Sequence, residues 1–264
     1  MENRKMNDNL WINRPEWFKS WFNSAAYHSL YGHRSEEEAV HLVDNLFRAG
    51  IVRAPGRALD AGCGAGRHAR ALSRAGMTTE AFDLSEQSIE MARKSSADNP
   101  RFRVLDLRML AQEEAWHGRF DLVTNFFTSL GYFSVVSEQQ AVIEGFEKVL
   151  KADGLLLIDY LNVPHVMENL VSHETIERNG VSFNIHRRVH QGWIEKSIKF
   201  VWEGEEHHHV ERVQALTLAK FQTLLAGNGL LIDRLFGDYD LGPWSQHSPR
   251  CLMIVKKRKA PLSR

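Results

Sequence analysis

The sequence contains few cysteines and no long apolar run. Among its 264 residues only Cys63 and Cys251 are cysteines, and they are far apart with no CxxC pairing. This excludes a disulfide framework and a cysteine-based zinc site, and it favours a reducing, cytoplasmic location. No stretch of about 18 apolar residues occurs, and the first residues lack the apolar segment of a signal peptide. We therefore expect neither a membrane span nor export.

The chain also lacks an excess of charge of either sign. It carries 33 Lys and Arg against 33 Asp and Glu, so no net field draws it toward polyanions. We therefore expect no nucleic-acid partner. An aromatic stripe near the N-terminus has no surplus of Lys or Arg, which favours a helix covering the core over a membrane-surface anchor. The stripe consists of Trp11, Trp17, Phe18, Trp21 and Phe22.

Strand and helix signals alternate along most of the chain. Helices are predicted at 39–50, 67–76, 86–95 and 141–150, and strands at 57–60, 78–83, 102–106, 120–127 and 155–160. Helix starts are indicated by Ser85 and by two capping boxes, Ser35 with Glu38 and Ser137 with Gln140. This alternation predicts an α/β fold with a doubly wound parallel sheet and helices on both faces.

The pattern changes after Pro164. Residues 181–190, 193–204 and 205–216 have period-two stretches separated by Gln-Gly and Glu-Gly pairs, which predicts an antiparallel β meander of three strands. A helix at 217–229 and strands at 230–236 and 250–258 then return to the core. The predicted organisation is an N-terminal helical lid plus Rossmann-like core over 1–163, an inserted substrate lid over 164–215, and the end of the core over 216–264.

Three glycines lie between the first predicted strand and its helix, in the segment "DAGCGAG". A turn made of Gly62, Gly64 and Gly66 lets a ligand approach main-chain atoms that a Cβ would block, although such turns also occur for packing alone. Asp83 follows at the end of the next strand, where a carboxylate can accept both hydroxyls of a ribose. Asp106 ends the third strand. The strand ends are therefore predicted to converge on one nucleoside-like ligand.

The residues beside the glycines indicate which nucleoside. Dinucleotide-binding loops place a small residue where this chain has Arg67, and the carboxylate of Asp60 repels phosphate but suits an ammonium group. An amino-acid-bearing nucleoside is therefore favoured. An NAD-dependent oxidoreductase of Rossmann type and a non-catalytic nucleoside-binding protein stay open as alternatives.

The sequence resembles the class I S-adenosylmethionine-dependent methyltransferases through "ALDAGCGAGRHA", "FDLSEQSIEMAR", "RVLDLR" and "FDLVTNFFTSLGYF". The resemblance implies a seven-stranded sheet with a reversed last hairpin and S-adenosyl-L-methionine as cofactor. It also implies that Gly62, Gly64, Asn125 and Phe126 line the methionine portion, Asp60 reaches its ammonium, Asp83 with Leu84 holds the ribose, and Asp106 with Leu107 frames the adenine. The segment "AAYHSLYGHRSEEEA" is similar to the entrance of amino-sugar N-methyltransferases, which implies that Tyr27, Tyr31 and Arg34 close over the cofactor.

Methyl transfer from a sulfonium is an in-line displacement and needs no covalent catalyst. Tyr132 and Tyr27 are the predicted catalytic residues, although Tyr132 and Phe133 are also typical packing residues. The sugar N-methyltransferases carry a histidine where this chain has Tyr132, so their substrate does not transfer directly. Since "TNFFTSLGYF" has no proline, methylation of nucleic-acid bases loses support. A nitrogen or oxygen of a small molecule is the expected acceptor, and a homodimer is left open.

Three further groups of polar residues remain to be assigned. Asp159, Tyr160 and Asn162 end the fifth strand of the core and are expected to position substrate. The run His207 to His209 cannot close one metal site, because successive strand side chains point to opposite faces. No metal is therefore expected. Cys63 is interpreted as a small residue in a tight turn rather than as a reactive thiol.

Overall fold

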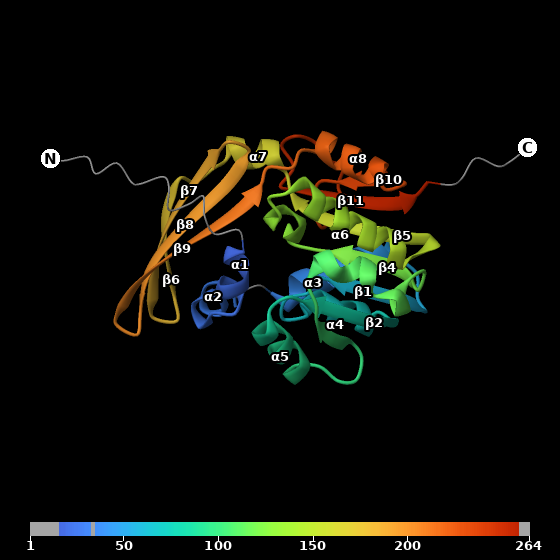
Figure 1. Cartoon of the computed structure of the whole chain (residues 1–264), viewed down its shortest axis with the longest axis horizontal. Helices are drawn as coiled ribbons and strands as arrows, with labels where there is room; N and C mark the ends of the chain where they lie inside the picture. Colours follow the sequence, from blue (N-terminus) through green and yellow to red (C-terminus); the bar gives the residue numbers. More distant parts are fainter. Residues whose placement is uncertain (1–15, 33–34, 259–264) are drawn as a thin grey trace, which may run out of the picture.

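The computed structural model describes residues 16–32 and 35–258. Trp11 and Arg34, both named by the sequence analysis, lie outside the described residues. Figure 1 shows two sheets, a helix-covered core and a separate antiparallel sheet, with the two N-terminal helices between them. Among the described residues, no helix is long and apolar enough to cross a membrane.

The core is a seven-stranded sheet with one reversed strand. Its order is β10 (Leu230–Phe236), β11 (Arg250–Lys257), β5 (Leu150–Leu161), β4 (Phe120–Asn125), β1 (Gly56–Ala61), β2 (Met77–Asp83) and β3 (Arg101–Val104). β11 runs antiparallel to both of its neighbours, and the strands from β5 to β3 are parallel. The predicted doubly wound α/β sheet and its reversed last hairpin are confirmed. Because the strand order reverses between β1 and β4, this is where such folds bind ligands.

Helices cover both faces of this sheet. One face carries α3 (Glu36–Arg48), α4 (Arg67–Arg74) and α5 (Glu86–Lys94), and the other carries α6 (Val136–Val149) and α8 (Leu218–Gly227). Leu42 and Leu72 on one side and Phe146 and Phe221 on the other are completely buried. Short 3-10 helices follow two of the strands. η2 (Leu107–Gln112) and η3 (Glu114–Trp116) come after β3, and η4 (Ser129–Tyr132) comes after β4.

The predicted helix starts are correct at α3 and α5 and wrong at α6. Ser35 and Ser85 accept hydrogen bonds from the third residue beyond them, as helix caps do. α6 begins at Val136, so Ser137 lies inside its first turn rather than at its cap. The Glu138 carboxylate accepts the Val135 N–H at 3.4 Å and satisfies one exposed donor of this end instead.

The antiparallel sheet has four strands, one more than predicted. They are β6 (His173–Arg178), β7 (Val181–His190), β8 (Trp193–Trp202) and β9 (Glu205–Gln214), and α7 (Val163–Glu168) connects β5 to them. All three turns have two central residues with positive φ, the geometry that matches the twist of a two-residue hairpin. These pairs are Asn179-Gly180, Gln191-Gly192 and Glu203-Gly204. The strand β6 was missed because "HETIER" has only one large apolar residue.

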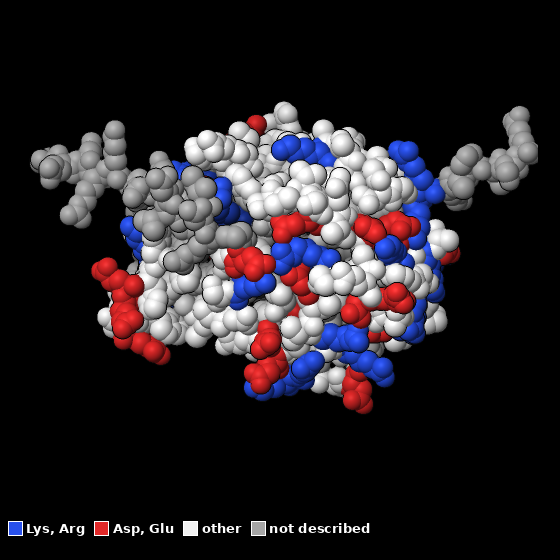
Figure 2. Space-filling model, in the orientation of Figure 1, with Lys and Arg blue, Asp and Glu red and all other residues white. Residues whose placement is uncertain are grey.

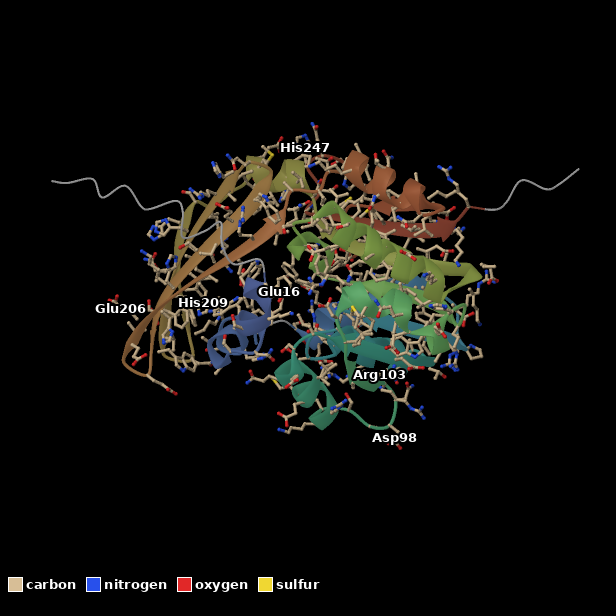
Figure 3. The ribbon with its side chains drawn as sticks, in the orientation of Figure 1. Glu16, Asp98, Arg103, Glu206, His209 and His247 are labelled. Atoms are coloured by element: carbon tan, nitrogen blue, oxygen red, sulfur yellow. The ribbon has the colours of Figure 1, made fainter. Side chains whose placement is uncertain are left out.

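The N-terminal helices α1 (Trp17–Phe22) and α2 (Ala25–Tyr31) join the two sheets. Trp21 is completely buried, stacks on His209 with ring centres 4.3 Å apart, and donates its Nε1–H to Glu211 at 2.7 Å. Figure 3 labels His209 on β9 beside these helices. Phe18 is 4% exposed and packs in the main core. The described part of the aromatic stripe therefore covers the core, as predicted.

Charged side chains are distributed differently on the two parts of the molecule. Over the core, Figure 2 shows Lys and Arg interspersed with Asp and Glu. At the tip of the antiparallel sheet acidic side chains gather, and the β8–β9 turn supplies the exposed Glu203, Glu205 and Glu206 there. The core surface thus carries both signs, while this tip is acidic.

Candidate active site

The glycine loop forms a bare main-chain cradle at the carboxyl end of β1. Gly62, Gly64 and Gly66 have φ values of 79°, 53° and 83°, in the left-handed region that glycine adopts without cost. The N–H groups of Gly62 and Cys63 donate to the Phe82 carbonyl, which ties the loop to β2. Cys63 is buried, and burial raises the pKa of its thiol well above the usual value. This fits a packing role for Cys63.

Two adjoining cavities open over this loop. The larger has a volume of about 360 Å³ and the smaller about 50 Å³. They share five lining residues: Phe22, Gly62, Asp83, Ser129 and Tyr132. The larger volume lies in the range of about 300–1,000 Å³ that is typical of small-molecule sites. The two cavities therefore form one site at the strand-order reversal, with Gly62 and Asp83 at their junction.

Asp83 has the geometry expected of a hydroxyl-binding carboxylate. Its Oδ2 accepts the Gly64 N–H at 2.8 Å and its Oδ1 accepts the Ser85 N–H at 2.9 Å. Burial raises the pKa of Asp83, and the backbone hydrogen bonds oppose that rise. Because a carboxylate oxygen can accept more than one hydrogen bond, each oxygen keeps acceptor capacity for a ligand hydroxyl.

Asp60 lies beneath the loop and does not line either cavity. It is 1% exposed, and its Oδ1 accepts the Thr124 hydroxyl at 2.9 Å. Burial, followed by the nearby charge of Asp83, raises the pKa of Asp60 to about 7. Its Oδ2 is buried without a hydrogen-bond partner. An unpartnered carboxylate oxygen of this kind gains from a nearby cation, so the residue fits a cofactor that carries an ammonium group.

The smaller cavity has an apolar wall and an acidic edge. Leu84, Leu105 and Leu107 line it together with Phe18 and Phe133, which suits a flat aromatic base. The sequence analysis expected the carboxylate of Asp106 to frame the adenine as well.

That carboxylate is already engaged by Arg108. Burial raises the pKa of Asp106, but the hydrogen bonds and charge of Arg108 outweigh this, so the pKa lies below its ordinary value. Arg108 also pairs with Glu138 at 2.7 Å and with Glu16 at 2.9 Å. Figure 3 labels Glu16 where α1 begins, between the antiparallel sheet and the core. Arg108 thus links the third strand end to both α6 and the N-terminal helices.

The segment after β4 forms the opposite wall of the site. Asn125 donates to the Ala61 carbonyl at 2.8 Å and does not line the cavities, whereas Phe126 lines the larger one and stacks on His68 with ring centres 4.0 Å apart. Ser129 would lie 3.0 Å from a Cβ at Gly62. A side chain at Gly62 would therefore crowd this wall.

Tyr27 and Tyr31 of α2 and Tyr132 of η4 meet at the larger cavity. Tyr132 packs on Phe22 with ring centres 5.3 Å apart, and Phe22 packs on Tyr27 at 4.9 Å. The Tyr31 hydroxyl donates to the carboxylate of Glu211 on β9. All three tyrosines line the larger cavity.

The three residues at the end of β5 are not available to an acceptor, which corrects their predicted role. Asp159, Tyr160 and Asn162 are at most 2% exposed. Tyr160 donates to the Gln214 carbonyl at 2.6 Å, and Asn162 donates to three carbonyls between Ser245 and Ser248. The polar groups of these side chains already form hydrogen bonds within the protein. No local sequence signal indicates those hydrogen bonds.

Several lining residues were not predicted at all. They include His28, His68, Phe127 and Ser129. Ser129 follows β4 by four residues, a position at the carboxyl edge that could have signalled it. The others depend on packing between distant elements. Among residues 16–32 and 35–258, no group of His, Cys, Asp and Glu is placed to hold a metal ion. His207 and His209 share one face of β9, where both lie against Phe200.

Comparison with known proteins finds methyltransferases. Residues 58–154, which run from β1 into β5, match the family model described as a methyltransferase domain. A putative methyltransferase of Geobacillus sp. (strain WCH70) is 25% identical over 209 residues, covering 76% of this chain and 84% of the relative. The dTDP-3-amino-3,4,6-trideoxy-alpha-D-glucopyranose N,N-dimethyltransferase of Streptomyces venezuelae is 25% identical over 190 residues, covering 68% and 77%.

A solved structure shows the same fold. An S-adenosylmethionine-dependent methyltransferase from Clostridium acetobutylicum superposes with a TM-score of 0.73 at 16% identity, covering 88% of this chain and 96% of the other. The fold is Rossmann-like, and the glycine cradle lies at the strand-order reversal where such folds bind ligands. Residues 58–154 form a methyltransferase domain, and the fold of the chain is that of S-adenosylmethionine-dependent methyltransferases.

Proposed function

We propose that the protein transfers a methyl group from S-adenosylmethionine to a nitrogen or oxygen of a small-molecule acceptor that enters the larger cavity. The observation that carries this proposal is the pair of adjoining cavities that share Gly62 and Asp83. The smaller cavity offers an apolar wall for an adenine, Asp83 offers acceptors for a ribose, and the glycine cradle leaves room for a methionine chain. The larger cavity extends past this region toward Tyr27 and Tyr132.

The cofactor supplies an electrophilic methyl group. The residues around the cavity orient the acceptor and exclude water. Displacement requires the acceptor atom to be held in line with the methyl carbon. Six aromatic residues line the larger cavity and can exclude water while packing on the acceptor: Phe22, Tyr27, Tyr31, Phe126, Phe127 and Tyr132. We assign Tyr132 and Tyr27 as the groups that contact the acceptor, because their hydroxyls can orient it or take its proton.

A nitrogen acceptor is favoured within this proposal. The Streptomyces venezuelae relative is named as an N,N-dimethyltransferase of an amino sugar linked to dTDP. An amine must be unprotonated to attack. A reducing, cytoplasmic location accompanies this function and fits the two buried free cysteines, while the choice between monomer and homodimer stays open.

The first test is cofactor binding by isothermal calorimetry. We expect S-adenosylhomocysteine to bind the purified protein and NADH to bind far more weakly. Asp83→Ala should weaken binding by about 1–3 kcal/mol, because it removes the acceptors of the ribose hydroxyls. Asp121→Asn, a change at the amino-terminal edge of the same sheet, is the matched control and should leave the dissociation constant unchanged.

The second test is transfer itself. Radiolabelled S-adenosylmethionine is incubated with panels of nucleotide-linked amino sugars, simple amines and phenols, and the label is followed into each panel. Label in an amine or a phenol supports the proposal, and the panel that is labelled identifies the acceptor atom. Tight cofactor binding with no transfer to any panel would favour the non-catalytic alternative.

A further inference from the structure

The wall after β4 has a backbone conformation that its residue types disfavour. Phe127 and Thr128 have φ values of 56° and 68°, in the left-handed region that L-residues other than Asn and Asp rarely adopt. The same wall carries Ser129 and Tyr132 into both cavities and Phe127 into the larger one. Two consecutive disfavoured residues persist only where the surrounding structure holds them.

Asp159 of β5 holds both of these residues. Its carboxylate Oδ2 accepts the Phe127 N–H at 3.2 Å, and its main-chain carbonyl accepts the Thr128 N–H at 3.1 Å. The Thr128 carbonyl in turn accepts the Gly131 N–H at 2.8 Å, which starts the 3-10 turn that ends at Tyr132. A continuous chain of hydrogen bonds therefore runs from Asp159 to the turn that presents Tyr132.

Residues from the end of the chain fix Asp159 in turn. Arg250 of β11 donates its Nε–H to Oδ1 at 2.8 Å, and the Tyr239 hydroxyl donates to Oδ2 at 2.8 Å. Asp159 is completely buried, so its charge is matched inside the protein by Arg250. The Arg250 guanidinium also lies 5.5 Å from the centre of the Phe127 ring. We call Asp159, Tyr239 and Arg250 the Asp159 cluster.

None of the three residues of the Asp159 cluster lines either cavity. Burial raises the pKa of the Tyr239 hydroxyl, so it stays protonated and remains a hydrogen-bond donor. Burial also works against the charge of Arg250, but Asp159 outweighs it and raises the pKa of the guanidinium. Tyr239 and Arg250 thus both keep the protons that they donate to Asp159. The cluster is built as a fixed support.

We propose that Asp159 is a positioning residue: through Phe127 and Thr128 it sets the conformation of the wall that contacts both cofactor and acceptor. This inference rests on the proposed function of the cavities. Asp159→Asn is the sharpest probe, because an amide presents one acceptor and one donor where the protein offers donors to both oxygens. Either Arg250 or the Phe127 N–H and Tyr239 hydroxyl must then face an NH₂ group.

The test combines this change with a rescue. Asp159→Asn removes the side-chain contact to the Phe127 N–H and keeps the main-chain carbonyl that accepts the Thr128 N–H. Glycine adopts left-handed φ values freely, so Thr128→Gly should lower the strain of the pair and restore the wall. Asp121→Asn is the matched control, since Asp121 also accepts a main-chain N–H, from Arg57 at 2.8 Å, and pairs with a cation, Lys151. Two quantities are measured at a temperature well below the thermal unfolding midpoint of every variant. They are the dissociation constant of S-adenosylhomocysteine and the rate of amide hydrogen exchange over residues 126–132 without ligand.

We expect Asp159→Asn to weaken S-adenosylhomocysteine binding about tenfold and to speed exchange over 126–132. The double variant with Thr128→Gly should recover most of the affinity, and Asp121→Asn should match the wild type in both readouts. If Asp159→Asn does not fold, Tyr239→Phe replaces it and should weaken binding about threefold by removing one hydrogen bond.

The inference is overturned if Asp159→Asn binds and exchanges like the wild type, or if Thr128→Gly recovers nothing. It is also overturned if Asp121→Asn weakens binding as much as Asp159→Asn does. Failure of the wild type to bind S-adenosylhomocysteine would instead overturn the proposed function. In that case the exchange data still decide whether Asp159 holds the wall.

Discussion

The two walls of the site reach similar backbone geometry by different routes. After β1, left-handed φ values occur at Gly62, Gly64 and Gly66, residues that accept them at no steric cost. After β4, they occur at Phe127 and Thr128, which need support from Asp159. The glycine cradle is thus encoded locally, whereas the wall that reaches Tyr132 depends on side chains more than 30 residues away. A short motif can therefore identify the cofactor but not the acceptor.

The largest expected effect is at the cradle itself. A Cβ at Gly66 would lie 2.6 Å from the Phe102 ring at a φ of +83°, so Gly66→Ala should destabilise the fold by about 2–4 kcal/mol. A Cβ at Gly64 meets nothing within 4 Å, so Gly64→Ala should cost only about 1 kcal/mol for its backbone conformation. Urea unfolding measures both. Equal losses would mean that conformation alone, and not the close approach to Phe102, limits the loop.

The second prediction concerns the wall after β4. Tyr132→Phe keeps the ring that packs on Phe22 and removes only the hydroxyl. If that hydroxyl orients the acceptor, kcat should fall about 10- to 100-fold, while the dissociation constant of S-adenosylhomocysteine stays within about twofold. Steady-state kinetics with the labelled acceptor, alongside calorimetry, separates the two effects. An unchanged kcat would assign Tyr132 to packing only.

The third prediction uses the buried carboxylate beneath the cradle. The pKa of Asp60 is raised to about 7, above its value in the unfolded chain, so the folded state binds the proton more tightly. Its contribution to stability is present below the unfolded pKa and is lost as the pH rises through 7. Relative to Asp60→Asn, the wild type should lose about 1–3 kcal/mol of unfolding free energy between pH 5 and pH 8.

Urea unfolding of both proteins across this pH range checks the prediction. Asparagine can still accept the Thr124 hydroxyl, so the variant removes the titration while keeping the hydrogen bond. Parallel pH profiles for the two proteins would contradict the raised pKa. They would also remove the argument that Asp60 gains from a nearby ammonium.

The smallest expected effect is at the cover of the site. Glu211 accepts hydrogen bonds from Trp21 and Tyr31, so Glu211→Gln should loosen α1 and α2 against β9 at a cost of about 0.5–1.5 kcal/mol. Faster amide exchange over residues 17–31 is the readout. Glu206→Gln, at the exposed tip of the same strand, should leave that exchange unchanged (Figure 3). Equal exchange in both variants would show that apolar packing alone holds the cover.

Sequence patterns determined the frame of this protein because their signals are local. Glycines at a strand-to-helix turn, helix caps such as Ser35 and Ser85, and apolar strands of fixed period predicted the doubly wound sheet and its cradle correctly. Asp83 could be placed because the end of a strand next to β1 must lie at the same edge. The strand β6 was not predicted. It lies at the edge of its sheet, where a strand needs few apolar residues, so its sequence shows no strand pattern.

Only the tertiary structure decided which of three carboxylates, those of Asp83, Asp106 and Asp159, are available to a ligand. Asp83 keeps acceptor capacity toward both cavities, Asp106 is paired with Arg108, and Asp159 is buried against Arg250. All three lie within two residues of the carboxyl end of a strand of the same sheet, so position along the chain does not distinguish them. Asp106 pairs with Arg108, two residues further along the chain, but Asp83 and Asp159 find Gly64 and Arg250 on other elements. Only folding brings that main-chain N–H and that cation within hydrogen-bonding distance.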